Sequence, residues 1–466
     1  RQPRFAGIVP LLAAEDLNAS QRAAIEFALS AEDIAIIHGP PGTGKTTSVA
    51  AFIRQAVLRG EKVLACAPSN TAVDNLLERL VDCGQRIVRI GHPARVKDVL
   101  RLHTLDAMVE THDNMRLVQD LLRQAEDRYR KADRHTRAKP ARGAKQDLRR
   151  EARQLKAESR QLEQQAIDHV LDRADVVCAT TSIDDAVLGD RVFDWVVIDE
   201  ACQCTESACW VPLQRGQRVL LAGDHCQLPP TVISPVAARE GYARSMLERL
   251  IETYGAAITR RLDVQYRMHD AIMRFSSAQF YHDSLQADDT VRSHLLSDLP
   301  QVASSPLTDA PLTYIDTAGA DYDEEQEPDG SSRRNPTEGR LVLDKVQQLI
   351  DAGVPVNDIA VIAPYAAQVR WLREHAPSRG VEIDTVDGFQ GREKEAVVIS
   401  LVRSNREGEI GFLGDTRRMN VALTRARRKL IVVGDSATLG GHPFYASLLE
   451  YFQAAGAYHT VWEEMY

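Results

Sequence analysis

The residues best suited to chemistry form one short run, Gly39–Thr46 (GPPGTGKT). The run fits the pattern G-x-x-x-x-G-K-[ST], in which glycines let backbone N–H groups close around phosphate oxygens. Lys45 can then reach the β- and γ-phosphates of a nucleoside triphosphate, and the hydroxyl of Thr46 can hold Mg²⁺. The run therefore predicts a phosphate-binding loop at the start of a helix.

Two carboxylates further along the chain supply the other half of this chemistry. The apolar run Phe193–Cys202 (FDWVVIDEAC) predicts a strand that ends in Asp199 and Glu200. In nucleotide hydrolases such acids hold Mg²⁺ and position the attacking water, so we assign the metal to Asp199 and the water to Glu200. Gln227 follows the next predicted strand and is a candidate sensor of the γ-phosphate.

A parallel sheet must position these residues, because each of them follows an apolar strand. Ile34–Ile37 indicates a short buried strand before the loop, and the apolar residues after Thr46 have helical spacing. Further strands are expected at 62–67, 175–180 and 218–222. This alternation of strand, loop and helix predicts an α/β fold with parallel sheets.

A helix ahead of the loop offers one more contact. Asn18 or Ser20 is placed to cap the helical stretch QRAAIEFALS. Gln21 precedes the loop by eighteen residues, and its amide could read the edge of an adenine base. The alternative is a helix glutamine that faces solvent.

Length and composition bound the possible classes. A chain of 466 residues exceeds one ordinary core, and 44% hydrophobic with 26% charged residues is typical of globular domains. The formal charge of −9 argues against a protein that coats nucleic acid generally, so any such partner must meet a local basic surface. No apolar run approaches the roughly 18 residues of a membrane span, and no signal peptide is visible. We therefore expect no membrane association.

Seven cysteines, an odd number in a long chain, favour a reducing compartment: cytoplasmic, nuclear or nucleoid-associated, and not secreted. Cys202, Cys204, Cys209 and Cys226 are close enough in sequence to suggest zinc. Their spacing lacks the usual paired C-x₂-C arrangement, which favours packed, reduced thiols.

The stretch from about 97 to 172 has a different composition. It is poor in strand formers, and between Met115 and Arg160 it carries 15 Lys and Arg against 7 Asp and Glu. Thinly spaced leucines, interrupted at Lys139–Gly143, predict two long helices that form a basic hairpin inserted in the first domain. Either this is a solvated charged face or the hairpin touches a nucleic-acid backbone.

Several longer blocks carry a family resemblance. DEAC, GDHCQLPP, VQYRMHD, VDGFQGREKEAVVISLVR and MNVALTRARRKL occur in this order and resemble superfamily-one helicases, over a match from Leu17 to Asp435. The chain is most similar to the 5′→3′ branch that contains the up-frameshift RNA helicase and the immunoglobulin mu-binding protein helicase. The resemblance implies two RecA-like domains, 1–255 and 256–466, with ATP between them. In relatives a small β-barrel precedes the Gln motif; here only Arg1–Asp16 precedes it, so we expect that barrel to be missing or truncated.

The resemblance also implies roles for residues of the second half. Tyr266 would stack on the nucleotide base, Arg267 would meet the γ-phosphate, and Arg425 would be an arginine finger. Judged without the resemblance, the first two could be a core aromatic and a surface arginine, and Arg425 could belong to a basic helix end. The set expected around the nucleotide is Gln21, Gly39, Pro41, Gly42, Thr43, Gly44, Lys45, Thr46, Thr47, Tyr266, Gly391 and Glu393.

A second set of residues is expected to hold a strand of nucleic acid. Ligands of open α/β sheets bind at the carboxyl ends of the strands, where polar side chains can donate to phosphate oxygens. Tyr365 could pack on a sugar or be a capping aromatic. The candidates are Ser69, Asn70 and Thr71 after one predicted strand, Pro364 and Tyr365 after another, and, by resemblance, Thr385 and Asp387.

Together these expectations describe an ATP- and Mg²⁺-dependent helicase or translocase. It would be a monomer that moves 5′→3′ on single-stranded DNA or RNA. Two alternatives remain: a translocase or remodeller that does not unwind duplexes, and a clamp whose hold on nucleic acid ATP switches.

Overall fold

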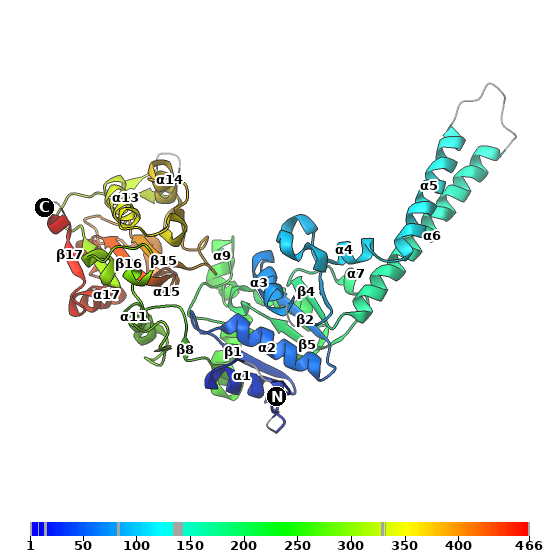
Figure 1. Ribbon diagram of the computed structural model, residues 1–466, viewed down its shortest axis with the longest axis horizontal. Helices are drawn as coiled ribbons and strands as arrows, with labels where there is room; N and C mark the ends of the chain where they lie inside the picture. Colours follow the sequence, from blue (N-terminus) through cyan, green and yellow to red (C-terminus); the bar gives the residue numbers. More distant parts are fainter. Residues whose placement is uncertain are drawn as a thin grey trace.

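The computed structural model describes residues 2–464 except 8, 14–15, 82–83, 134–142, 328–329 and 331. Figure 1 shows two α/β bodies side by side, with a long helical hairpin that projects from the first body on the side away from the second. Each body is built on its own parallel sheet. None of the described helices is long and apolar enough to cross a membrane.

The first sheet has seven strands in the order β3-β4-β2-β5-β6-β1-β7, and its neighbours all pair in parallel. Its strands are β1 (Ile34–His38), β2 (Val63–Ala67), β3 (Ile87–Arg89), β4 (Val176–Thr180), β5 (Phe193–Ile198), β6 (Gly216–Gly223) and β7 (Thr259–Arg261). The principal helices of this body are α1 (Ala19–Leu29), α2 (Lys45–Leu58), α3 (Asn70–Val81), α8 (Glu206–Leu213) and α10 (Met246–Tyr254).

Burial on both faces explains why these strands are apolar throughout rather than alternating. On β1, Ile36 packs into one core and its neighbour Ile37 into another, one on each face of the sheet. The register pairs His38 with Gly223, so the loops after β1 and β6 emerge side by side at the carboxyl edge. The sheet thus brings the phosphate loop next to the segment that holds Gln227.

The first sheet extends past the predicted division at 255/256, because β7 pairs with β1 as its edge strand. The chain then forms the short strand β8 (Val264–Gln265), which pairs with β9 (Gln286–Ala287). Between them runs α11 (Asp270–Phe280), whose apolar side chains Ile272, Met273 and Phe275 belong to a core of the second body. The change from one body to the other therefore falls between β7 and α11.

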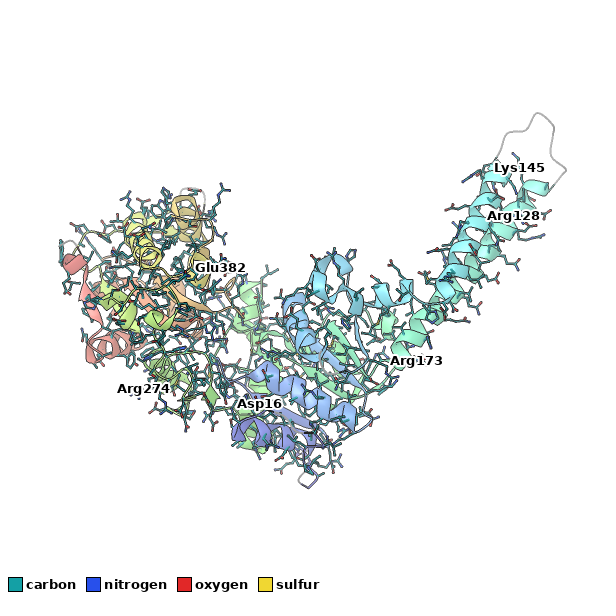
Figure 2. The ribbon with its side chains drawn as sticks, viewed as in Figure 1. Asp16, Arg128, Lys145, Arg173, Arg274 and Glu382 are labelled. Atoms are coloured by element: carbon teal, nitrogen blue, oxygen red, sulfur yellow. The ribbon has the colours of Figure 1, made fainter. Side chains whose placement is uncertain are left out.

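The inserted segment forms the hairpin of α5 (Asn114–Asp133) and α6 (Ala144–Arg173), preceded by the short helix α4 (Leu105–Glu110). Small buried side chains such as Ala125 and Ala152 allow the two helices to approach closely, and Arg128 pairs with Glu151 across them at 3.1 Å. In Figure 2, Arg128 and Lys145 lie towards the far end of the hairpin and Arg173 at its base. The predicted interruption at Lys139–Arg142 lies outside the described residues.

The second sheet has six strands in the order β14-β13-β15-β16-β10-β17. They are β10 (Leu312–Asp316), β13 (Ile359–Ala363), β14 (Glu382–Thr385), β15 (Lys394–Ser400), β16 (Ala426–Gly434) and β17 (Tyr458–Thr460). The sheet is again parallel and lies between two cores, with Ile362 in one and Val361 in the other. The accompanying helices include α13 (Pro336–Asp351), α14 (Ala366–His375), α15 (Thr416–Leu423) and α17 (Pro443–Ala454). The predicted fold class, two parallel RecA-like sheets with a helical hairpin inserted in the first, is confirmed.

Candidate active site

The phosphate loop is a turn that only glycine permits at three positions. Gly42 and Gly44 have φ of +77° and +74°, a region that favours glycine. A Cβ on Gly39 would lie 2.5 Å from the Cβ of Lys45, one on Gly42 would lie 2.8 Å from the side chain of Arg267, and one on Gly44 would lie 2.6 Å from the amide of Gln21. The loop is therefore packed on both sides, and α2 begins directly after it.

Lys45 lies at the centre of the site and holds two carboxylates. Its ammonium group is 2.5 Å from Oδ1 of Asp199 and 2.7 Å from Oε1 of Glu200. Burial opposes the charged form of this lysine, but the two carboxylates prevail and raise its pKa above the ordinary value. The register of β1, β6 and β5 explains the meeting, since the acids follow β5 in the same sheet.

Oxygen atoms suited to Mg²⁺ lie beside this ion pair. The hydroxyl of Thr46 is 3.1 Å from Oδ2 of Asp199, and Mg²⁺ prefers such hard oxygen ligands. Glu200 has a left-handed backbone with φ of +53°, which is costly for a residue with a side chain. Gln203 donates to its Oε2 at 2.9 Å. The donor set fits Mg²⁺, and the backbone fixes where Glu200 points.

Gln21 and Tyr266 contact the loop from outside the first sheet. Gln21 lies in α1, which Asn18, rather than Ser20, caps, and the Gln21 side chain completes a capping box with Asn18. The same Gln21 side chain donates to the carbonyl of Thr43 at 3.0 Å. Tyr266 donates its backbone N–H to the carbonyl of Gly42 at 2.8 Å, and its hydroxyl accepts from Asn18 at 2.9 Å. Gln21 and Tyr266 thus flank the loop, and their contact with a base stays a prediction.

The predicted arginines of the second body reach the same place. Arg425 is 2% exposed, and its guanidinium donates to Oε1 of Gln227 across the junction at 3.5 Å. Burial and the nearby Arg267 lower the pKa of Arg425 to about 9, while Glu393 and Glu200 act in the opposite direction. Arg267 pairs with Glu393 and donates to the carbonyl of Thr424 at 3.1 Å. Opposite charges from both bodies therefore converge at one site.

The remaining predicted nucleotide residues surround this group. Thr43 is buried and donates to the carbonyl of Pro40 at 2.7 Å, which closes the loop on itself. Thr47 accepts from Arg79 at 3.0 Å. Pro41, within the loop, is buried, and Gly391 has φ of +76° with open space where a Cβ would lie.

Sequence reasoning missed a hydrogen-bonded chain that joins the two bodies. Asp224, which follows β6 as Asp199 follows β5, accepts from Tyr281 at 2.7 Å and is 2.9 Å from Nε2 of His38. Asn420 of α15 donates to the Tyr281 hydroxyl at 2.9 Å and to the carbonyl of Cys226 at 2.9 Å. The position of Asp224 directly after a buried strand was the available signal. Tyr281 and Asn420 carry no such signal.

The four cysteines do not form a zinc site together. Of these, Cys202, Cys204 and Cys209 are buried free thiols. Cys226 lies apart from them, with His38, Asp224 and His225, in the one cluster of metal-ligand type among the described residues. The burial of Cys202, Cys204 and Cys209 as free thiols agrees with the prediction that they are packed in the core.

The predicted strand-binding residues lie at the carboxyl edges of both sheets. After β2, the hydroxyl of Ser69 accepts from the N–H of Ala72, and Asn70 accepts from Arg89 at 2.8 Å. Thr71 is exposed at the start of α3. These side chains flank the edge of the sheet that also carries the phosphate loop.

The second body contributes the other candidates. Thr385 accepts from the N–H of Gly388 at 3.2 Å, and Asp387 is 3.4 Å from Arg418. Pro364 is half-buried. Of the two roles left open for Tyr365, the structure favours the capping aromatic: it is the N-cap residue of α14 and is 3% exposed, so its ring is not available to a sugar.

Because the phosphate loop of one sheet and the arginines of the other meet at a single place, the protein belongs to the P-loop class with two RecA-like domains. Two family profiles, each described as an AAA domain, match residues 16–235 and 242–437. An ATP-dependent helicase of Methanocaldococcus jannaschii is 34% identical over 489 residues, which cover 96% of this chain and 72% of that protein. The chain belongs to this superfamily-one helicase family, in the branch of the up-frameshift and mu-binding protein helicases.

Two eukaryotic relatives are similar over shorter shares of their length. The DNA-binding protein SMUBP-2 of Rattus norvegicus is 49% identical over 454 residues, which cover 96% of this chain and 46% of the relative. The DNA polymerase alpha-associated DNA helicase A of Schizosaccharomyces pombe is 39% identical, with 91% and 64% covered. The chain thus spans a little under half of the rat protein.

Proposed function

We propose that the chain is an ATP-driven motor on single-stranded nucleic acid, a helicase that hydrolyses ATP at the junction of its two RecA-like domains. One observation carries the proposal: buried Arg425 of the second domain contacts Gln227 of the first, next to the pair of Lys45 and Glu200. A residue that completes the site from the opposite domain makes hydrolysis depend on how the domains sit together.

Residues of both domains would take part in the hydrolysis of ATP. ATP supplies a γ-phosphoryl group, and its transfer to water builds negative charge on the phosphoryl oxygens. Lys45 would bind those oxygens, a contact that relieves Glu200 of its ion pair and leaves this carboxylate to accept a proton from water. Arg425 and Arg267 would balance the developing charge, and such an arginine is worth about 10³–10⁵ in rate.

Three further residues would bind or sense the nucleotide. Thr46 and Asp199 would hold Mg²⁺ through their oxygen atoms. Gln227 bonds to Asp224 at 2.7 Å and to Arg425, so it would report an occupied phosphate site to the second domain.

A strand would lie across both domains along the carboxyl edges of their sheets. Ser69, Asn70 and Thr71 of the first domain and Pro364, Thr385 and Asp387 of the second would touch its backbone. Contacts to phosphate and sugar make the grip largely independent of sequence. The names of the rat and yeast relatives refer to DNA; for this chain we propose either DNA or RNA as the track, with movement 5′→3′ as in the family. Alternate closing and opening of the domains would move the grip along.

The decisive experiment compares the ATPase rate with single-stranded DNA, with single-stranded RNA and without polymer. The motor predicts a rate stimulated by at least one of the two strands, and equal rates in all three at low salt would contradict it. Displacement of a duplex with a 5′ tail, but not one with a 3′ tail, would establish unwinding and its direction. Stimulated hydrolysis without displacement would instead identify a translocase or remodeller, and binding without multiple turnover an ATP-switched clamp.

A further inference from the structure

Phe412 presents an exposed aromatic ring on the proposed strand-binding face. It lies in the short helix η8 (Gly411–Gly414), in the segment between β15 and α15, and is 57% exposed. It lines a small, mostly apolar pocket together with Pro364 and Arg418, and Arg418 contacts Asp387. Of the side chains that line the pocket, Phe412 alone is exposed. An exposed aromatic ring therefore lies among the residues expected to meet a strand.

Buried polar groups hold this ring in place. The Tyr365 hydroxyl accepts from the backbone N–H of Phe412 at 3.2 Å and from Nη1 of Arg403 at 3.2 Å. Arg403 is 3% exposed and pairs with Glu324 at 2.7 Å. A Cβ at position 411 would lie 2.5 Å from the Tyr365 hydroxyl, so Gly411 allows the close approach. The buried side chains of Tyr365 and Arg403 thus fix the backbone that bears Phe412.

The ring of Tyr365 supports that of Phe412 from within. The two ring centroids are 5.3 Å apart and the rings are tilted by 40°. Since Tyr365 is buried and its hydroxyl is engaged twice, it cannot itself offer a face to a ligand. The exposed face in this aromatic pair belongs to Phe412.

We propose that Phe412 stacks on an unpaired nucleobase of the bound strand, and that Tyr365 is a positioning residue that holds Phe412 for this contact. The inference rests on the proposed function, since it names a contact of the same strand. A base is the ligand that fits: every base has an apolar face for an aromatic ring, and its phosphate can pair with a neighbouring cation. Arg418, 3.4 Å from Asp387 and 3.7 Å from Asp415, is that cation.

The location also links the contact to the nucleotide site. Asp415 follows η8 directly and caps α15 by accepting from the N–H of Arg417 at 3.3 Å. The helix carries Asn420 of the interdomain chain and ends just before Arg425. In Figure 1, α15 lies on the side of the second domain that faces the first, whereas β17 lies on the far side. A base stacked on Phe412 would therefore contact the segment that leads through α15 to Arg425, the proposed arginine finger.

The test compares binding of a short oligothymidylate with binding of a strand of the same length whose sugars lack bases. Stacking of one base contributes about 5- to 150-fold in affinity. The wild-type protein is expected to bind the strand with bases at least about fivefold more tightly than the abasic strand. Phe412→Ala should reduce this ratio of affinities by the contribution of one stacked base, about 5- to 150-fold. Its affinity for the abasic strand should stay the same, because backbone contacts remain.

Two further variants separate stacking from structural damage. Tyr365→Phe removes both hydrogen bonds of the hydroxyl, of which the one from the N–H of Phe412 holds the ring. Loss of that one bond should lower the preference for bases by about fivefold, with abasic binding unchanged. Trp462 is 50% exposed beyond β17, an edge strand of the same sheet, so Trp462→Ala should keep the full preference.

Each contrary result has a distinct meaning. If Phe412→Ala keeps the wild-type preference, or Trp462→Ala loses it equally, the stacking proposal is overturned. A wild-type protein that binds both strands equally also overturns it, while the proposed motor function stands. A wild-type protein that binds neither strand defeats both.

Discussion

The nucleotide site and the strand-binding face differ in how their side chains are held. At the nucleotide site, Lys45, Asp199 and Arg425 are all at least nine-tenths buried and are bonded to partners from other strands or from the other domain. On the strand-binding face, Ser69 and Thr385 are more open and bond to backbone groups within their own loops. The first region is a buried assembly of side chains from several strands and both domains, whereas these residues of the second lie in loops that are more open to solvent.

The difference has a physical cause. Charge that develops during phosphoryl transfer is stabilised best by fixed groups in a dry site, because low dielectric strengthens every interaction. A strand must slide, so its contacts have to be numerous, individually weak and accessible to water. Substitutions and salt should therefore act differently on the two regions.

The largest effect is expected from Lys45→Ala, which removes the ammonium group from the buried site. ATP hydrolysis should fall to background, because Lys45 supplies the cation that pairs with Asp199 and Glu200 at that position. A steady-state ATPase assay measures this. The matched control is Lys97→Ala, an exposed lysine of the same domain that pairs with Glu78 at 2.8 Å; it should hydrolyse ATP normally. Near-normal turnover in Lys45→Ala would remove the phosphate loop from the mechanism.

Arg425→Ala should reduce the turnover number about 10³-fold with little change in nucleotide affinity, because its contact matters most in the transition state. Single-turnover hydrolysis and nucleotide titration together measure the two quantities. Arg428, in the same basic cluster, pairs with Glu395 of its own domain at 2.7 Å, so Arg428→Ala serves as the control. Equal losses in both variants would mean that the cluster acts only through general charge.

Salt should separate the two regions directly. Each phosphate that a Lys or Arg side chain neutralises on a single strand changes the logarithm of the affinity by about 0.7 per tenfold salt, so four such ion pairs would weaken strand binding about 50-fold between about 50 and 200 mM. Nucleotide binding to the buried site should change much less. Fluorescence titrations of a labelled strand and a labelled nucleotide give both slopes. Similar salt dependences of strand binding and nucleotide binding would contradict the proposed difference between an open and a buried region.

The smallest effect is expected from Tyr281→Phe, which removes the hydroxyl between Asp224 and Asn420. The free energy of unfolding should fall by about 1–3 kcal/mol, because two buried hydrogen bonds are lost, and the strand-stimulated ATPase rate should fall as well. Tyr314→Phe is the control, because its buried hydroxyl donates to the carbonyl of Gly434 within the second domain at 3.2 Å. That variant should lose stability without losing stimulation. Stimulation unchanged in Tyr281→Phe would show that the interdomain chain is structural only.

The same contrast explains what the sequence could predict. Phosphate-binding motifs depend on residue type and spacing, so the sequence could predict the fold class and could place Lys45, Asp199 and Glu200 in one site, where the structure brings them together. Which aromatic can contact a strand depends on which one is exposed. The local sequences at 364–368 (PYAAQ) and 411–414 (GFLG) do not reveal that Tyr365 is buried and Phe412 is exposed. Tyr281 and Asn420 were missed because a bond between segments far apart in the chain leaves no local pattern. The edge strand β7 was missed because three residues carry no period.

The most direct test is a crystal structure with Mg²⁺, ADP and a planar mimic of the transferred phosphoryl group, in the presence of a single strand. The account predicts that the mimic contacts Lys45 from one domain and the guanidinium groups of Arg267 and Arg425 from the other. A mimic held by the first domain alone, with both guanidinium groups out of hydrogen-bonding range, would contradict it.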